Sequence, residues 1–596
     1  MSQTDASAAE HQLPDWDLSH LYPGPDSAEF AADLEQADSD AKALESAHKG
    51  RVAELDGAAL GTAILAYEAI SERLGRLASY AYLRYAGDMA DQDLGRFNQT
   101  TRERITDISS RILFFTLELN RLEDADLELL YADPEVARYR PWIEATRLFR
   151  PHELGDDMER LLLEKSVAGR QAWVRLFDET MADIRLDVGG AELTLSDTLD
   201  RLSEPNRETR RQAAEALTAG LESQSRVLTL ITNTLAKDKA VEDLWRSHAN
   251  PMASRNLANQ VEDEVVDALV GAVRDGYPRL SHRYYQLKAG WLGFDVMQHW
   301  DRNAPLPEDD DSEIGWRQAR ETVLGAYHAF EPEMAAIAGR FFDENWIDAP
   351  PRPGKQSGAF SHPTVPSAHP YVLLNFHGRS RDVMTLAHEL GHGVHQVLAA
   401  GQGALLADTP LTLAETASVF GEMLTFRAML DAAGDDPRRR RVLLAGKVED
   451  MLNTVVRQIA FHSYEARVHA ARAEGELSTE AICDIWMDAQ RESLGPAFEF
   501  RDDYRMYWAY VPHFLHVPFY VYAYAFGDCL VNSLYAVFQS GHAGFQDKYL
   551  EMLRAGGTLR HRELLAPFGL DAADPAFWSR GLDVIAGLID ELEALG

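Results

Sequence analysis

The segment Arg381-Asp-Val-Met-Thr-Leu-Ala-His-Glu-Leu-Gly-His-Gly-Val-His395 decides how this chain of 596 residues arranges its chemistry. It places His388 and His392 four residues apart. In an α-helix, residues i and i+4 lie one above the other on the same face, so two imidazoles at this spacing can bind one metal ion. Glu389 lies between them and is directed at the remaining coordination position. The H-E-x-x-H pattern therefore predicts a water-activating zinc site.

The residues around this pattern favour a buried helix. Ser380 is the predicted N-cap, and Asp382 lies in the first turn, where the helix dipole favours an anion. The apolar surface of the helix comes from Met384, Leu386, Ala387, Leu390, Val394, Val397 and Leu398. Upstream, Tyr371–Phe376 predicts a short strand whose edge can pair with an extended peptide. The alternative is a buried helix whose two histidines bond only each other or a backbone carbonyl. The context favours the first interpretation, which is typical of metallopeptidases.

Downstream, residues 413–426 predict another amphipathic helix, which carries Glu415 and Glu422. The segment Thr385-Leu-Ala-His-Glu-Leu-Gly-His-Gly-Val-His395, followed by Ala414-Glu-Thr-Ala-Ser-Val-Phe-Gly-Glu422, resembles the M3 family of zinc oligopeptidases. It is most similar to the bacterial oligoendopeptidase F branch of that family. The opening Trp16-Asp-Leu-Ser-His-Leu-Tyr22 and the segment Ser357-Gly-Ala-Phe-Ser361 are also similar to that branch.

The resemblance implies a third zinc ligand. In the family, the glutamate of the second segment completes the site, which corresponds to Glu415. His395 is a rival because it lies on the His388 face at i+7, but its Cα would be about 10.5 Å along the axis from that of His388. That separation strains a tetrahedral site shared with His392. We therefore expect one Zn²⁺ ion bound by His388, His392 and Glu415, with His395 beside the site or in the substrate channel.

Two further features stay open at this point. Glu422 either accepts a hydrogen bond from a ligating imidazole or is a solvated charge.

Near the C-terminus, residues 512–527 resemble the family's aromatic segment, in which a histidine and tyrosines face the zinc and hold the substrate carbonyl. The candidates are His513, His516, Tyr520 and Tyr524. This branch usually carries one histidine before Pro-Phe-Tyr and here there are two, so the counterpart is not decided. A buried aromatic helix explains any single tyrosine equally well, whereas the group as a whole suits a site that stabilises an oxyanion.

The resemblance implies a mainly α fold. We expect a large helical zinc metallopeptidase with a small β-sheet beside the active-site helix and two lobes enclosing a substrate channel. The predicted reaction is hydrolysis of internal peptide bonds in short unfolded peptides, with Glu389 as the general base for a zinc-activated water. An exopeptidase, of the dipeptidyl carboxypeptidase or carboxypeptidase type, would use the same chemistry. It would also need a cationic side chain for the terminal carboxylate, for which the nearby candidates are Arg379, Arg381 and Arg501. A helical scaffold that has lost catalysis is disfavoured, because the ligands and the base are all present.

Composition limits the partners and the location. The chain has 58 basic and 95 acidic residues and a formal net charge of -37, which argues against binding to nucleic acid or to anionic membranes. No apolar stretch approaches the roughly eighteen residues of a membrane span. Cys483 and Cys529 are too few for a disulfide framework. Residues 1–11 have neither the positive nor the apolar region of a signal peptide. We therefore expect a cytoplasmic protein.

Helical patterns dominate the chain, for example at 60–84, 90–119 and 208–221. The period changes at 184–188 and 191–195, which flank Gly189-Gly190 and predict a two-residue β-hairpin with Ser196 capping the next helix. We place a domain boundary there, with residues 1–195 as an N-terminal helical domain and residues 196–596 as the catalytic domain. Residues 305–312 are rich in Pro and Asp and predict an exposed loop.

Overall fold

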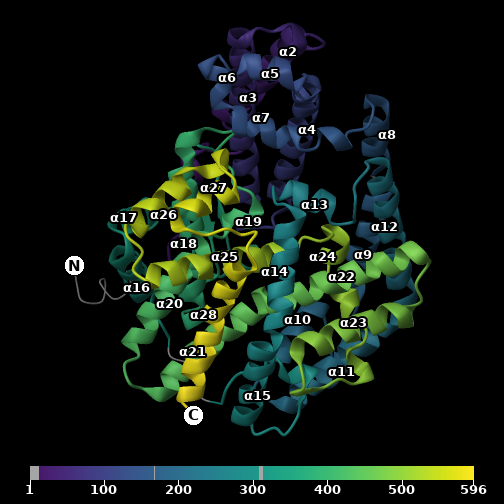
Figure 1. Cartoon of the computed structure of the whole chain (residues 1–596), viewed down its shortest axis with the longest axis vertical. Coiled ribbons are helices and arrows are strands. Elements are labelled where there is room, and N and C mark those ends of the chain that lie inside the picture. Colours follow the sequence, from purple (N-terminus) through teal and green to yellow (C-terminus); the bar gives the residue numbers. More distant parts are fainter. Residues whose placement is uncertain (1–12, 167, 308–312) are drawn as a thin grey trace. The chain divides into compact units, whose positions relative to one another are not determined.

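The computed structural model of the protein describes residues 13–166, 168–307 and 313–596. Helices dominate it (Figure 1). The strands are short and form small sheets. The chain divides into two compact units, each assembled from three stretches. The first unit comprises Met1–Arg150, Asp311–Ala432 and Phe538–Leu570, and the second comprises Pro151–Asp310, Ala433–Val537 and Asp571–Gly596. The predicted mainly helical fold is confirmed, whereas the predicted domain boundary after residue 195 stays a prediction. Residues 308–312 of the predicted loop lie outside the described residues.

The first unit begins with three long helices that pack against one another. They are α2 (Ala28–His48), α3 (Gly57–Gly87) and α4 (Gln92–Arg121). Asp56 and Asp91 are the N-caps of α3 and α4, because their carboxylates accept backbone N–H groups of the first turn. The helices predicted at 60–84 and 90–119 are therefore confirmed. Three short helices follow, namely α5 (Asp124–Leu130), α6 (Pro134–Arg138) and α7 (Arg140–Arg147).

A small sheet lies beside one helix in the rest of the first unit. Its strand order is β4-β6-β5, with β4 (Ile347–Asp348) parallel and β5 (Phe360–His362) antiparallel to β6 (Tyr371–Leu373). All three residues of β6 are buried, and β5 and β6 both contact α18 (Ser380–Ala399). The predicted strand is confirmed but ends at Leu373 rather than at residue 376. The other helices are α16 (Trp316–Phe330), α17 (Pro332–Asp343), α19 (Leu411–Ala414), α20 (Ser418–Ala432), α26 (Phe545–Arg554) and α27 (His561–Leu565).

The predicted hairpin forms part of the second unit. Strand β1 (Leu186–Val188) pairs antiparallel with β2 (Ala191–Leu193), and Gly189 and Gly190 between them both have positive φ, as a two-residue turn requires. The predicted cap is wrong, however. The next helix, α10 (Leu195–Asp200), has Thr194 as its N-cap, because the Thr194 side chain accepts the N–H of Asp197.

The second unit is otherwise helical. A two-stranded parallel sheet joins β3 (Met297–Gln298) to β7 (Phe498–Glu499). The helices are α8 (Asp156–Ser166), α9 (Arg170–Asp183), α11 (Arg207–Ser223), α12 (Ser225–Trp245), α13 (Ala253–Ala258), α14 (Asp263–Gly276), α15 (Ser281–Leu292), α21 (Pro437–Thr454), α22 (Val456–Glu474), α23 (Thr479–Leu494), α24 (His513–His516), α25 (Tyr522–Gln539) and α28 (Pro575–Ala594). Cys483 and Cys529 are buried and free. Among the described residues, no helix combines the length and the apolar character needed to cross a membrane.

Candidate metal centre

Helix α18 begins in a different way from the sequence prediction. Ser380 is its first residue rather than its N-cap, and Arg379 holds the cap position. The carboxylate of Asp382 accepts the backbone N–H groups of His377, at 2.8 Å, and of Arg379, at 3.0 Å. An anion in the first turn also complements the helix dipole. Asp382 therefore caps the start of α18, the helix that carries the two histidines.

The middle of α18 lies very close to the segment before α20. A Cβ atom on Gly391 would lie 2.4 Å from the carbonyl oxygen of Ala417 and 2.6 Å from the Cα of Ser418. Only glycine allows the two backbones to approach so closely. One turn earlier in the same helix, the hydroxyl of Tyr327 in α16 donates to the carbonyl of Ala387. This packing brings the residues before α20 against the face that carries His388 and His392.

The prediction of one continuous helix over residues 413–426 is wrong, because the helix is interrupted in this range. Helix α19 ends at Ala414, and α20 starts at Ser418. The Ser418 hydroxyl lies 2.7 Å from Oε2 of Glu415 and 3.1 Å from its backbone carbonyl. Such local serine bonds compete with continuous helix. The break frees Glu415 from the α20 surface and places its carboxylate against α18.

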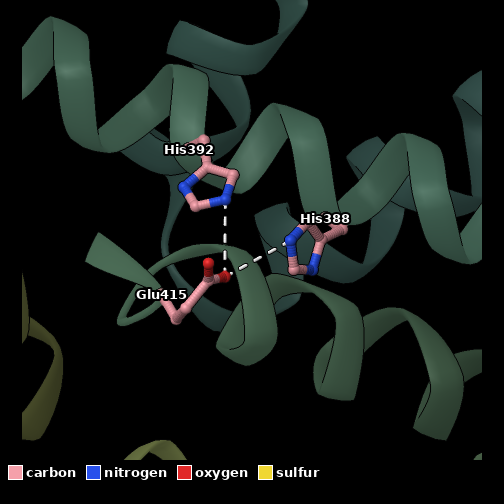
Figure 2. Close-up of side chains that lie close together, drawn as sticks. All are labelled: His388, His392 and Glu415. Atoms are coloured by element: carbon pink, nitrogen blue, oxygen red, sulfur yellow. Dashed lines mark ion pairs between the residues drawn. The ribbon is translucent and has the colours of Figure 1, made fainter. Parts of the chain in front are cut away.

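Three side chains converge as a result. Figure 2 shows the imidazoles of His388 and His392 directed from α18 at the carboxylate of Glu415. Their Nε2 atoms lie 3.3 Å and 3.4 Å from the same oxygen, Oε2. A tetrahedral zinc ion with bonds of about 2.05 Å requires ligand atoms about 3.3 Å apart. The distances therefore fit the edges of a zinc tetrahedron. In the described part of the chain, no other trio of His, Cys, Asp or Glu side chains is arranged to hold a metal ion.

The second ring nitrogen of His388 is also bonded. Its Nδ1 lies 3.2 Å from Oε2 of Glu422, one of the two interpretations that the sequence left open. Burial alone would lower the pKa of His388, but its bonds to Glu415 and Glu422 raise this pKa well above the usual range. Burial alone would raise the pKa of Glu415, and its bonds to the two histidines hold it well below the usual range. The opposite shifts of His388 and Glu415 reflect the direct contact between these two side chains.

Glu389 and His395 lie on the same helix but have different surroundings. Both are 6% exposed. Burial raises the pKa of Glu389, partly offset by the two nearby histidines and by a hydrogen bond from the backbone N–H of Ser361 in β5. Burial lowers the pKa of His395 to about 4, and its ring bonds the backbone carbonyl of Ala414. His395 therefore lies outside the trio and anchors the end of α19, next to Glu415.

In the second unit, the structure separates the two histidines that the sequence could not distinguish. His513 Nε2 lies 3.3 Å from the hydroxyl of Tyr524, and its ring stacks on Tyr520 with a centroid separation of 6.0 Å. The rings of Tyr520 and Tyr524 are 5.1 Å apart. We call His513, Tyr520 and Tyr524 the aromatic cluster, and all three are partly exposed. His516 instead lies at the surface, with Nε2 2.7 Å from Asp178.

Tyr522 is a core residue. It is fully buried, its hydroxyl donates to Asn256 at 2.7 Å, and it accepts from Asn259 at 2.9 Å. Sequence reasoning did not find the Ser361 N–H bond to Glu389 or the buried carboxyl of Glu465 beside the aromatic segment. The segment containing Ser361 had been singled out by its resemblance, but Glu465 gave no signal because it is a lone glutamate within a helical pattern.

Known proteins resemble this chain over nearly its whole length. The model of peptidase family M3 matches residues 201–584, and a model described as Oligopeptidase F matches residues 118–185. The chain is 27% identical to oligopeptidase PepF of Bacillus subtilis (strain 168), over 98% of this chain and 89% of that protein. It is 26% identical to an oligoendopeptidase F homologue of Lactococcus lactis subsp. lactis (strain IL1403), over 97% of each.

Solved structures share the fold. A putative peptidase from Chlamydophila abortus superimposes with a TM-score of 0.84 at 22% identity, covering 98% of both chains. Oligoendopeptidase-F from Enterococcus faecium superimposes with a TM-score of 0.70 at 20% identity, covering 95% of this chain and 99% of that one. The family model alone spans more than half of the chain. The protein therefore belongs to peptidase family M3, and it is a metallopeptidase of the oligoendopeptidase F branch.

Proposed function

We propose that the protein is a zinc-dependent endopeptidase that hydrolyses internal bonds of short oligopeptides. The observation that carries this proposal is the convergence of His388 and His392 on one oxygen of Glu415, with Glu389 on the same helix. The names of the relatives, oligopeptidase and oligoendopeptidase, support the substrate class. The channel that would admit only short unfolded peptides is implied by the family resemblance.

The trio suits zinc by its chemistry as well as by its spacing. Two imidazole nitrogens and one carboxylate oxygen are the ligand set of many catalytic zinc sites, which keep a fourth position for water or substrate. When bound, the ion supplies Lewis acidity to the attacking water and to the scissile carbonyl. The contact between His388 and Glu422 would fix the orientation and tautomer of that ring, as carboxylates do in other metal sites.

Glu389 would act as the general base. Its carboxylate is buried and accepts a hydrogen bond from the backbone N–H of Ser361, which restricts the orientation of the side chain. Burial raises its pKa, which makes it a better proton acceptor than an exposed glutamate. In the proposed reaction it takes a proton from the attacking water, whose oxygen bonds to the carbonyl carbon. It then delivers that proton to the nitrogen of the leaving amine as the C–N bond breaks.

The aromatic cluster is the proposed source of hydrogen bonds to the substrate carbonyl oxygen as it gains negative charge. This role follows from the resemblance of residues 512–527 to the family's aromatic segment. The contacts of His513 with Tyr520 and Tyr524 favour these three residues over His516, which bonds Asp178. Tyr522 is not a candidate, since both bonds of its hydroxyl are to buried asparagines.

The alternative is an exopeptidase that binds a terminal carboxylate. The three arginines considered for binding a terminal carboxylate either lie at the start of α18 or contact an aromatic ring. Arg379 caps α18 and Arg381 lies in its first turn, about two turns before His388, while Arg501 lies over the ring of Trp300. The endopeptidase remains our proposal.

One experiment decides between the two activities. A peptide of about eight residues, acetylated at its N-terminus and amidated at its C-terminus, is incubated with the enzyme, and the products are identified by mass spectrometry. The endopeptidase cleaves this peptide internally, whereas an exopeptidase leaves it intact. The reaction is repeated after treatment with 1,10-phenanthroline and again after zinc is restored. We expect activity to disappear and then return, and full activity in the metal-stripped enzyme would contradict the zinc assignment.

A further inference from the structure

The connection between α24 and α25 contains an unfavourable backbone conformation. Phe519 has a φ of +58°, in the left-handed region that residues with a Cβ rarely adopt. It immediately precedes Tyr520, and its own side chain is fully buried. Pro518, just before it, has no N–H to donate. A strained turn of this kind persists only where surrounding groups hold it, so its contacts are informative.

One face of helix α22 supplies those contacts. Oε1 of Glu465 accepts the backbone N–H of Phe519 at 2.9 Å, in a bond buried from solvent. The rings of His462 and His469 contact the Phe519 ring edge-on and at a tilt, with centroid separations of 6.0 Å and 4.9 Å. These three residues occupy positions i, i+3 and i+7, which fall on one face of a helix.

The backbone on the other side of the turn is held by two arginines of the same unit. Arg170 of α9 donates to the carbonyls of Leu515 and His516, both at 2.8 Å. Arg255 of α13 donates to the carbonyl of Pro518 at 3.4 Å. Glu465 is the member of this set that bonds the strained residue itself. Its other oxygen, Oε2, is buried and has no hydrogen-bond partner among the described residues.

We propose that Glu465 is a positioning residue for catalysis. By accepting the N–H of Phe519, it holds the left-handed turn that sets Tyr520 and Tyr524 beside His513. The inference rests on the proposed function, in which the aromatic cluster holds the substrate carbonyl. In this proposal Glu465 acts through the turn, by its bond to the Phe519 N–H.

The surroundings of Glu465 make it a hydrogen-bonding group more than a charge. Burial raises its pKa to about 8, although the Phe519 N–H, Arg255 and Lys239 each oppose the shift. Lys239 is itself bonded to Asp243 at 2.9 Å. Burial lowers the pKa of both His462 and His469 to about 4, so both are neutral at pH 7. The ionisable side chains around the carboxyl are Arg170, Lys239, Arg255, His462, Tyr464 and His469. A neutral glutamine should therefore imitate the carboxyl that is present at neutral pH.

The test compares two variants at this position with a matched control elsewhere in the unit. Glu465→Leu removes the acceptor, and Glu465→Gln keeps it. Asn233 is the control, because it is also buried and its Oδ1 accepts the backbone N–H of Leu477 at 2.8 Å. Zinc content, apparent Tm, kcat and KM are measured for all three. Amide exchange is followed by mass spectrometry on peptides that span residues 513–524.

We expect Glu465→Leu to lose about 10- to 100-fold in kcat with KM within about threefold of wild type, because the turn acts on groups that matter in the transition state. Its zinc content should be unchanged, and exchange at the Phe519 amide should rise at least about tenfold. Glu465→Gln should keep kcat within about threefold. Asn233→Leu should lower the apparent Tm without changing kcat. Equal kcat losses in Glu465→Leu and Asn233→Leu would overturn the proposal by revealing a general loss of stability.

Combining variants separates this inference from the proposed function. In a Tyr520→Phe/Tyr524→Phe background, Glu465→Leu should reduce kcat by less than about twofold further, because the groups it positions are already gone. If the tyrosine variants lose activity and Glu465→Leu does not, Glu465 is not a positioning residue and the proposed function stands. If the tyrosine variants keep wild-type kcat, the role of the cluster fails, and the positioning role fails with it. If Glu465→Leu does not fold, a Glu465→Gln variant with raised exchange at Phe519 and wild-type kcat overturns the proposal.

Discussion

The metal trio and the aromatic cluster reach their geometry by different physical means. Two members of the trio, His388 and His392, project from consecutive turns of α18. The third, Glu415, comes from the segment between α19 and α20, which can approach α18 closely because residue 391 is a glycine. The aromatic cluster instead surrounds an irregular connection with a left-handed residue at its centre. That connection is held by side chains from α9, α13 and α22, far away in the sequence.

This difference determines how each region should respond to mutation. Regular helix geometry keeps the remaining residues in place when one side chain of the trio changes, so each variant should reveal one chemical role. In the aromatic segment, we expect a residue outside the proposed substrate contacts to move the residues that make them. We therefore expect sharply separated effects in the first region and coupled effects in the second.

The largest expected effect is on the proposed base. Glu389→Gln keeps the shape of the side chain but removes its ability to accept a proton, so kcat should fall by about 10²- to 10⁴-fold. The histidines and Glu415 are untouched, and zinc measured by atomic absorption should stay near one ion per chain. A variant that lost its zinc together with its activity would place Glu389 among the groups that hold the metal.

The next comparison separates a ligand from a residue that supports one. Glu415→Gln replaces the carboxylate on which both Nε2 atoms converge, so we expect zinc to be largely lost on dialysis against a weak chelator. Glu422→Gln keeps an oxygen acceptor for Nδ1 of His388, and its zinc affinity should fall by at most about 10- to 100-fold. Equal zinc affinity in the two variants would contradict the assignment of Glu415 as a ligand.

The same contrast explains how much could be predicted from the sequence. The trio was predicted because i and i+4 spacing has one meaning on a helix, and because the resemblance supplied Glu415. The break before Ser418 was missed, since residues 413–426 keep an amphipathic pattern and the competing Ser418–Glu415 bond is a matter of tertiary placement. Similarly, the cap at Arg379 differs from the predicted Ser380 because Asp382 accepts the backbone N–H groups itself.

The aromatic segment was recognised but not resolved into roles. His513 and His516 are three residues apart, and the sequence pattern of the segment does not separate one from the other. The structure separates them by the contacts of His513 with Tyr520 and Tyr524, and by the contact of His516 with Asp178, 338 residues away. The bond between Glu465 and Phe519 also could not be predicted from the segment, because Glu465 lies 54 residues before Phe519. Spacing predicts contacts within an element, whereas these contacts join separate elements.

A third prediction tests the cluster directly. Tyr520→Phe or Tyr524→Phe removes one hydroxyl and leaves the ring, so the apparent Tm should hardly change. At least one of these variants should lose about 10- to 10³-fold in kcat with zinc retained, as removal of an oxyanion donor does. Tyr522→Phe is a useful contrast, because it removes a hydroxyl that bonds only buried asparagines and should lower stability by about 1 kcal/mol while leaving kcat unchanged.

A fourth prediction concerns the two histidines. His513→Ala removes a ring that contacts both tyrosines of the cluster, and kcat should fall by about tenfold or more. His516→Ala removes an exposed contact with Asp178, which is worth about 1 kcal/mol or less at the surface, and kcat should stay within about twofold. The opposite pattern in steady-state assays would assign the functional role to His516.

The smallest expected effect is a change of stability with pH at Glu465. Burial raises the pKa of this carboxyl to about 8 in the folded chain, above the value near 4.5 that it has when exposed. Between these values the folded state binds a proton that the unfolded state has released, so rising pH favours unfolding. The stability contributed by the protonated carboxyl is full below about pH 4.5 and is lost as pH rises through 8. Glu465→Gln cannot ionise, so its apparent Tm should gain about 1–3 °C relative to wild type between pH 5.5 and pH 8.5 and no more above that. A difference in Tm that does not change across this range, measured by calorimetry, would mean that the carboxyl is already ionised at neutral pH, and Lys239 and Arg255 would then be its effective partners.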